Sequence, residues 1–298
     1  MFQGSVRAFD EVARVKSIRK ASDILGLAPS SVSRQVAILE HQIGTSLLER
    51  QSHGVELTRA GALVADYVRR ILLEYDGLRA DLDDVRGNSR HLVRLAAVES
   101  IASSVPMEAV RILSQSYPGV SFNFRLLPAP LVIEAITSGQ AEIGLAYCAR
   151  PDPQIARLAS IPEPVMLAVA ADHALAASEQ LRIQDLASIR LGLPDRDLGV
   201  RRIIDEAAAS AGVRLDPVLS SNDFEVLRAF VRRGSGAALL PMRAILHDGG
   251  KLRAVPVDAG PFAAATIDLI VLRERRLPRI LKAFVNVLIV EIAQAGRS

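Results

Sequence analysis

Residues 17–36 read SIRKASDILGLAPSSVSRQV, and this stretch decides the N-terminal fold. It holds two short helical patterns on either side of Gly26, a residue that can adopt the left-handed conformation that ends a helix. Ser17 is a suitable N-cap for the first helix, and Pro29 suits the first turn of the second. The second helix is expected to bury one apolar stripe, made of Val32, Val36, Leu39 and Ile43.

Two short helices joined by a tight turn form a helix-turn-helix, whose second helix enters the major groove of DNA. The outer face of this second helix is small and polar enough to lie against DNA, since it carries Ser30, Ser33 and Arg34. An ordinary helical hairpin with a polar outer face would produce the same local pattern. The rest of the chain has to distinguish the two interpretations.

The composition excludes several classes of protein. The 298 residues, half of them hydrophobic, are enough for two or three packed domains. No apolar run approaches the ~18 residues of a membrane span, and charged residues interrupt the N-terminus where a signal peptide is apolar. We therefore expect a cytoplasmic protein without membrane contact. Cys148 is the only cysteine, so no intrachain disulfide can form, and the scattered histidines predict no metal site and no cofactor.

The segments that flank the helix pair extend it to a winged arrangement. Residues 3–15 form an amphipathic helical pattern that would pack against the pair. After the pair, residues 51–54 are typical of a turn, and Val55–Leu57 alternates like a strand. The sequence therefore predicts a small β-wing beside the two helices.

A long helix is predicted over residues 59–87. Its apolar residues are spaced 4, 3, 4, 3, 4 and 3 apart, in a heptad stripe of Val64, Val68, Ile71, Tyr75, Leu78, Leu82 and Val85. A helix of this length spans ~43 Å, too long to be buried within a small domain. The stripe therefore needs a partner, and the same helix of a second chain is the simplest one. Packing of the stripe on its own domain is the alternative.

From residue 91 onward, strand and helix patterns alternate. A β-α-β-α-β run over residues 92–147 predicts a parallel sheet with right-handed crossovers. A second set of strands and helices begins at residue 165, and a strand and a helix close the chain over residues 266–295. We expect two α/β lobes, about 91–162 with 266–298 and about 163–265, and a cleft between them that suits a small ligand.

At this point the chain resembles the LysR-type transcriptional regulators along its whole length. In the N-terminal part the resemblance rests on Phe9, Ser17, Ala21, Leu25, Ser33, Arg34, Gln35, Leu39, Glu40, Gly44, Leu47, Glu49, Arg50, Leu57, Thr58 and Gly61. In the C-terminal part it rests on residues 117–120, 139–144 and 172–173, on Gly199 and Arg201, and on residues 234–241.

The resemblance implies an α/β protein with three parts: a winged helix-turn-helix (residues 1–58), a dimerising linker helix (59–87) and a two-lobe effector domain like periplasmic binding proteins (88–298). It implies a homodimer or homotetramer that binds double-stranded promoter DNA and contacts RNA polymerase. A small-molecule effector in the inter-lobe cleft, with a carboxylate as one candidate, would modulate that binding. The alternative is a periplasmic-type binding protein or an enzyme on the same fold. No catalytic residues are expected, because no nucleophile elbow, phosphate loop or dinucleotide fingerprint appears.

The resemblance also assigns the DNA-binding residues. These are Pro29, Ser30, Ser33, Arg34, Gln35, Arg50 and His53. Since the formal net charge is only +3, phosphate contacts must come from the local placement of such side chains. Many relatives carry a Ser-Gln pair where this chain has Ala28 and Pro29, so a helix cap and an adenine-reading amide are absent here. For Arg50, a structural ion pair beside the wing is the alternative role.

The expected effector-binding residues lie at strand ends and helix starts. They are Ser100, Ala129, Tyr147, Arg201 and Asn222. Ser100 and Asn222 each precede a helix, where an anion is favoured, but each would equally serve as a cap or a rim residue. At Ala129, relatives that respond to aromatic acids often place a hydroxyl, which this chain lacks. Arg201 would meet a carboxylate, with a solvated helix face as its alternative.

Overall fold

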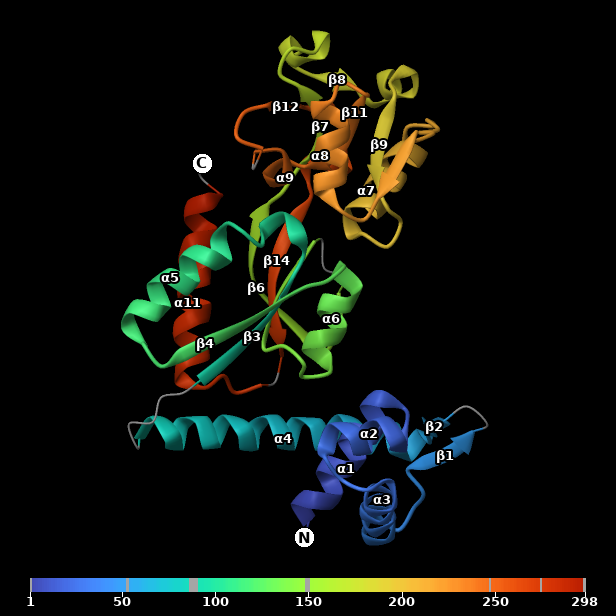
Figure 1. The fold of residues 1–298 in the computed structure, drawn as a ribbon, viewed down its shortest axis with the longest axis vertical. Coiled ribbons are helices and arrows are strands. Elements are labelled where there is room, and N and C mark those ends of the chain that lie inside the picture. Colours follow the sequence, from blue (N-terminus) through green and yellow to red (C-terminus); the bar gives the residue numbers. More distant parts are fainter. Residues whose placement is uncertain are drawn as a thin grey trace. The chain divides into compact units, whose positions relative to one another are not determined.

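In the computed structural model the chain is described over residues 2–51, 54–85, 91–147, 151–246, 248–273 and 275–296. It divides into two compact units, the first built mainly from the N-terminal 87 residues. The first unit contains α1 (Phe2–Val15), α2 (Ile18–Leu25), α3 (Pro29–Ile43), β1 (Leu48–Gln51), β2 (Gly54–Leu57) and α4 (Arg59–Val85). Figure 1 shows α4 as a single long helix.

The predicted helix pair is confirmed as α2 and α3. The Ser17 side chain accepts a hydrogen bond from the Lys20 backbone N–H at 3.3 Å, and Gly26 has a φ of 64°. Val32, Val36 and Leu39 are buried against Phe9 and other apolar side chains of α1. Ile43, the last residue of α3, is exposed instead, so the buried stripe ends at Leu39. Strands β1 and β2 pair in an antiparallel hairpin, as predicted for the wing.

The heptad stripe of α4 is divided between two environments. Val68 is buried in the core of the N-terminal unit, and Val64 packs against the same core, so the prediction that these two residues face a second chain is wrong. Their positions near the start of α4 bring them against this unit's own core residues. Ile71, Tyr75, Leu78 and Leu82 are 39–55% exposed. The side chain of Val85 lies outside the described residues.

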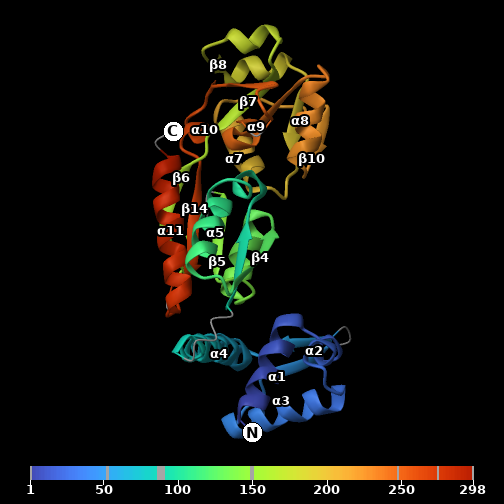
Figure 2. The ribbon, with the colours of Figure 1, turned by 60° about the vertical axis from the view of Figure 1, so that its left-hand side comes forward.

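The second unit contains two lobes. The first lobe has a sheet in the order β4-β3-β5-β14-β6. Its elements are β3 (His91–Ala97), η1 (Glu99–Ile101), α5 (Val105–Ser116), β4 (Val120–Leu126), α6 (Ala129–Thr137), β5 (Ile143–Tyr147), β6 (Ile155–Pro162), β14 (Thr266–Leu272) and α11 (Arg279–Ala295). Strands β3, β4 and β5 are parallel, as predicted, whereas β14 runs antiparallel to β5 and β6. Helices α5 and α11 lie side by side on one face of this sheet (Figures 1 and 2).

The second lobe repeats this arrangement with the sheet order β10-β9-β11-β7-β12. Its main elements are β7 (Val165–Ala170), β9 (Leu191–Pro194), α7 (Gly199–Ser210), β10 (Leu219–Ser221), α8 (Phe224–Arg232), β11 (Ala237–Pro241), α9 (Met242–Leu246) and β12 (Leu252–Val255). Shorter elements are η2 (Ala174–Ala177), β8 (Leu181–Arg182), η3 (Ile183–Ser188), β13 (Val257–Asp258) and α10 (Gly260–Ala263). Strands β9, β10 and β11 are parallel, and β7 is antiparallel to β11 and β12.

The chain crosses between the lobes twice, and the two crossings are bonded to each other. The Glu163 backbone N–H donates to the Ala265 carbonyl at 2.9 Å. The buried carboxylate of Glu163 forms an ion pair with Arg243, at the start of α9. The Arg243 guanidinium also donates to the carbonyls of Pro162 at 2.7 Å and Ala295 at 3.2 Å. One buried arginine of the second lobe therefore holds both the crossing and the last helix of the first lobe.

Candidate DNA interface and effector cavity

The start of α3 presents the polar face predicted to read DNA. Pro29, Ser30 and Arg34 are exposed, and Ser33 is partly exposed. Within the described chain, neither the Ser30 hydroxyl nor the Arg34 guanidinium has a hydrogen-bond or ion-pair partner. Both groups are therefore available to an external phosphate or base. Helix α3 begins at an N-cap, Ala28, that makes no side-chain hydrogen bond, in agreement with the missing cap noted in the sequence.

The other predicted DNA contacts are placed differently. Gln35 is partly buried, and its Oε1 atom lies beside Gly4 of α1, inside the first unit, which we call the DNA-reading head. This placement favours packing between α1 and α3 over contact with a base. Arg50 lies on β1, one strand of the wing, but its side chain is outside the described residues. His53 is outside them altogether.

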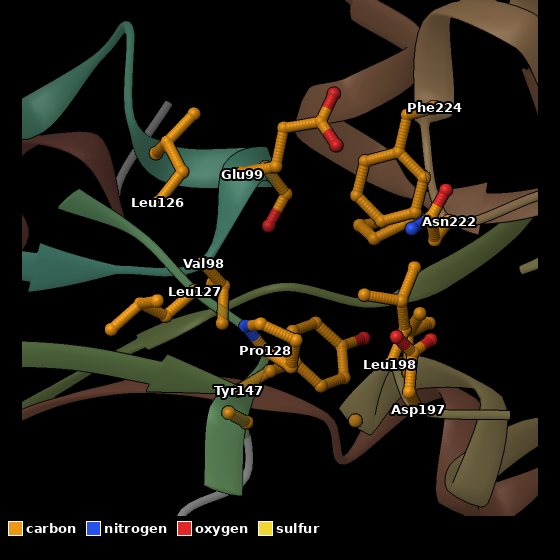
Figure 3. Close-up of a pocket in the computed structure, with 15 residues that line it drawn as sticks. Val98, Glu99, Leu126, Leu127, Pro128, Tyr147, Asp197, Leu198, Asn222 and Phe224 are labelled. Atoms are coloured by element: carbon orange, nitrogen blue, oxygen red, sulfur yellow. The ribbon is translucent and has the colours of Figure 1, made fainter. Parts of the chain in front are cut away.

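A cavity of about 230 Å³ lies between the two lobes of the second unit (Figure 3). Its walls come from the carboxyl ends of the parallel strands. On the first lobe, Val98 follows β3, Leu127 follows β4 and Tyr147 ends β5. On the second lobe, the loop after β9 supplies Asp197 and Leu198, and the loop after β10 supplies Asn222. Ligands of open α/β sheets bind at this end of the strands, because the helix N-termini and loops there leave room and donors.

Most of the cavity wall is apolar, and four side chains add polar groups: Glu99, Ser100, Asp197 and Asn222. Ser100 is only 5% exposed, and its hydroxyl makes no hydrogen bond to any residue that the structure describes. The Glu99 carboxylate, on the first lobe, lies near the Phe224 backbone N–H at the start of α8, on the second lobe, and this N–H favours its charged form. Figure 3 shows Glu99 and Phe224 facing each other across the cavity.

Burial raises the pKa of Glu99 above its ordinary value. The neighbouring carboxylates of Asp223 and Glu225 raise it further, while the Phe224 N–H and the Arg228 guanidinium lower it. The Tyr147 hydroxyl donates to the Glu163 carbonyl at 2.7 Å, so this residue offers the cavity mainly its ring. The arrangement suits reversible binding of a small, largely apolar molecule with a few polar groups.

Both units match known sequence families. Residues 4–62 match the bacterial regulatory helix-turn-helix protein of the lysR family, and residues 86–291 match the LysR substrate binding domain. The chain belongs to the LysR family of transcriptional regulators. Among its relatives is the HTH-type transcriptional regulator YfeR of Shigella flexneri, itself uncharacterized, which is 30% identical over 83% of this chain and 80% of that protein.

Solved structures of LysR regulators share the whole fold. A full-length OxyR variant from Pseudomonas aeruginosa superposes with a TM-score of 0.70 at 17% identity, covering 98% of this chain and 94% of that one. Full-length CbnR complexed with its target DNA superposes with a TM-score of 0.54 at 21% identity, covering 98% and 99%. The fold predicted from the sequence is therefore confirmed: a helix-turn-helix domain followed by a two-lobe domain.

In this LysR regulator, four of the five predicted effector residues line the inter-lobe cavity: Ser100, Ala129, Tyr147 and Asn222. The fifth, Arg201, does not. Its buried guanidinium donates to Asp205 at 2.8 Å and to the Pro194 carbonyl at 2.9 Å, which commits it to its own helix and strand. The prediction that Arg201 meets the effector is therefore wrong for the structure described here.

The sequence reasoning missed two charged residues of the LysR effector cavity. Glu99 directly precedes Ser100, and Asp197 lies two residues before the start of α7. Glu99 lies two residues after the end of β3, and this position at a strand end could have identified it as a cavity residue from the sequence. Asp197 lies in a loop whose position depends on the second lobe as a whole, and its sequence context gave no comparable indication.

None of the helices that the structure describes is both long enough and apolar enough to span a membrane.

Proposed function

We propose that this LysR-type regulator binds double-stranded promoter DNA with the exposed start of α3. The observation that carries the proposal is the exposed Arg34 guanidinium, which has no partner within the described chain, beside the exposed Ser30 and Pro29. Arg34 would hold a backbone phosphate, and Ser30 and Ser33 would bond a phosphate or a base. Pro29 has no side-chain donor or acceptor, so it offers only an apolar contact to a thymine methyl group.

We propose further that α4 forms the seam of a homodimer. The exposed large apolar residues of this helix form a stripe: Leu63, Tyr67, Ile71, Tyr75, Leu78 and Leu82. They follow one another at spacings of 4, 4, 4, 3 and 4, so they share one side of the helix. Leu63 and Tyr67 take the places of Val64 and Val68 in the seam, because the two valines are occupied by the core of their own domain.

The seam can be tested by oligomeric state. Leu78→Arg would place a charge in the middle of the stripe and is expected to convert the dimer to a monomer in light scattering coupled to size-exclusion chromatography. Ala62→Arg introduces the same side chain at an exposed position outside the stripe and should leave the dimer intact. A dimer that persists with Leu78→Arg would contradict the proposed seam. Two such dimers that contact each other through their second units would form the homotetramer.

For the second unit, we propose that a small molecule binds between the lobes and alters how the dimer engages the promoter and RNA polymerase. The proposed contacts are Ser100, Ala129, Asn222 and the Tyr147 ring. A ligand that touches both lobes has a different affinity for each lobe arrangement, and this difference is the free energy available for regulation.

The proposed parts are a DNA-binding domain over residues 1–58, a linker helix over 59–87 and an effector domain over 88–298. The proposal contains no catalytic step, since the relatives are transcriptional regulators. Promoter DNA as the partner implies a cytoplasmic location.

The direct test is footprinting of the purified protein on the intergenic DNA upstream of its own gene. We expect two spaced protected regions whose extent or affinity changes with a bound effector. The Arg34→Ala protein should protect neither region at the same concentration and salt. If the wild-type protein protects no DNA there, with or without candidate metabolites, the proposed function is contradicted.

A further inference from the structure

In the part of the chain that the structure describes, the charged side chains on the wall of the effector cavity are all of one sign. Among the described residues that line it, Glu99 and Asp197 are acidic and none is Lys, Arg or His. An effector carboxylate buried here would find no cationic side chain on the described wall, and it would meet a like charge at Glu99. Removing a carboxylate from water without a counter-charge is strongly unfavourable.

The N-terminus of α8, which would otherwise attract an anion, already has carboxylates of the protein. The Asp223 side chain accepts from the Glu225 backbone N–H at 2.7 Å, and the Glu99 carboxylate lies near the Phe224 N–H. At α7 the N-cap Leu198 makes no side-chain hydrogen bond, but Asp197, two residues before the first residue of the helix, adds a negative charge near this positive end.

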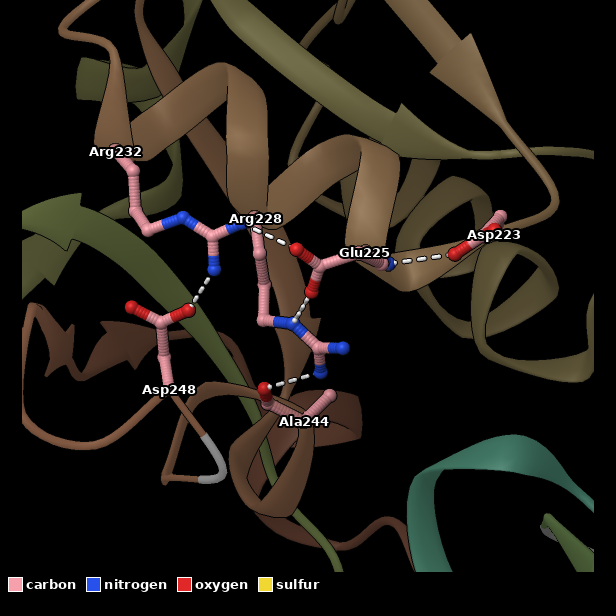
Figure 4. A network of polar contacts seen from close by, with 6 residues as sticks. All are labelled: Asp223, Glu225, Arg228, Arg232, Ala244 and Asp248. Atoms are coloured by element: carbon pink, nitrogen blue, oxygen red, sulfur yellow. Dashed lines mark hydrogen bonds and ion pairs between the residues drawn. The ribbon is translucent and has the colours of Figure 1, made fainter.

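The arginines near Glu99 are committed elsewhere (Figure 4). Arg228 donates to Glu225 at 2.9 Å and to the Ala244 carbonyl at 3.0 Å. Arg232 is paired with both Glu225 and Asp248. This cluster holds three carboxylates, counting Asp223, and two guanidinium groups, so the wall behind α8 adds no net positive charge to the cavity.

Two uncharged polar side chains complete the site. The Ser100 hydroxyl is nine-tenths buried and has no partner among the described residues, and the Asn222 amide lines the opposite wall with no described partner either. A buried hydroxyl such as that of Ser100 needs a hydrogen-bond partner, and a bound ligand would supply it. Asn222 is exposed, so its amide can bond to water or to a ligand. Glu99 likewise lacks a strong counter-charge, which agrees with the direction of its pKa shift.

We propose that the effector is a small cationic molecule, an amine on an apolar body, and that Glu99 selects it. The ammonium group donates to the Glu99 carboxylate, with Ser100 and Asn222 as neutral partners, and the apolar body lies against the Leu127, Leu198 and Phe224 side of the wall. This inference rests on the proposed effector cavity and changes the class of ligand from the carboxylate expected from the sequence.

The test compares benzylamine, benzyl alcohol and benzoate, which share one apolar body and differ in charge. Dissociation constants are measured by ligand-observed NMR on the full-length protein at neutral pH. We expect benzylamine to bind most tightly and benzoate most weakly. Glu99→Gln keeps an acceptor for the Phe224 N–H but removes the charge, and it should weaken benzylamine binding about tenfold while leaving benzyl alcohol nearly unchanged.

Two further variants keep the outcome interpretable. Glu179→Gln removes one exposed acid that does not line the cavity and should leave benzylamine binding unchanged. Asp197→Asn should weaken it, but less than Glu99→Gln, because Asp197 is exposed. If benzoate binds as tightly as benzylamine, or if Glu179→Gln has the effect of Glu99→Gln, the inference fails and the effector cavity stands. If none of the three probes binds, the inference and the cavity's proposed role fail together.

Discussion

The DNA-reading head and the two-lobe unit use charge in opposite ways. On α3, Arg34 is exposed and has no partner within the described chain. At the crossings between the lobes, Glu163 and Arg243 are buried and paired with each other. An exposed charge interacts through water and is screened by salt, whereas a buried charge interacts strongly with a few fixed neighbours. Substitutions should therefore alter binding in the head and folding in the two-lobe unit.

The largest effect is expected at the buried pair. Arg243→Met leaves the Glu163 carboxylate without its counter-charge, and we expect the unfolding free energy of the second unit to fall by about 3–5 kcal/mol. Urea denaturation followed by circular dichroism measures it. Adding Glu163→Gln removes the uncompensated charge but keeps a side-chain acceptor for the backbone N–H of residue 243. The double variant should regain part of the lost stability; an equal or greater loss would show that the charge is not the cause.

At the exposed Arg34 we expect the opposite pattern, in which DNA binding is weakened and stability is unchanged. Arg34→Ala should weaken operator binding about tenfold and reduce the slope of log affinity against log salt by about 1, since one phosphate contact is lost. Its thermal stability should not change. Gel-shift titrations over a series of salt concentrations measure both quantities. Lys251→Ala, which removes one exposed positive charge from the second unit, is the control. A loss of stability without a change in salt slope would assign Arg34 a structural role.

The missing cap of α3 allows a smaller effect within the head. Ala28→Ser would supply a side-chain acceptor for the first backbone N–H groups of the helix and should raise the unfolding free energy of the head by about 0.5–1 kcal/mol. Ala28→Val, which adds no acceptor and is as poor an N-cap as alanine, is the control. Equal stability of the serine variant and the wild type would mean that the cap position is already satisfied. Thermal unfolding of the head measures the difference.

The smallest effect is expected at Glu99, which is only half-buried. Because burial raises the folded-state pKa of Glu99, ionisation of this group opposes folding, and the folded state loses stability as pH rises from the unfolded-state pKa through the folded-state pKa. Glu99→Gln should therefore melt slightly above wild type at pH 7, and the difference should disappear near pH 4, where Glu99 is protonated. Asp223 and Glu225 increase the effect, and Arg228 reduces it. A melting difference that is constant between pH 4 and pH 7 would contradict the assignment.

The sequence predictions succeeded where the interactions involve residues close together in the chain. The turn at Gly26, the Ser17 cap and the core stripe from Val32 to Leu39 depend on neighbours within a few residues, and all are observed. The α4 stripe shows the limit of such reasoning. Its heptad spacing predicted one continuous stripe, but spacing alone does not say that Val68 packs into its own domain while Leu78 stays exposed.

The effector cavity shows the same limit more strongly. Ser100 and Asn222 were expected from their positions before helices, and both line the cavity. Arg201 was expected because an arginine suits a carboxylate ligand, but Asp205, one helical turn away, and a strand-end carbonyl take its donors. Glu99 and Phe224 are far apart in the chain, and only the arrangement of the two lobes brings the carboxylate to the start of α8.

By itself the sequence determined the order of the elements, the helix-turn-helix, the long α4 helix and the two-lobe α/β class, because hydrophobic period, caps and turns are local properties of a chain. The tertiary structure alone decided which half of the α4 stripe is available to a partner and what charge the effector cavity carries. Both depend on which surfaces bury one another, and burial determines whether a charge is paired, screened by water or left for a ligand.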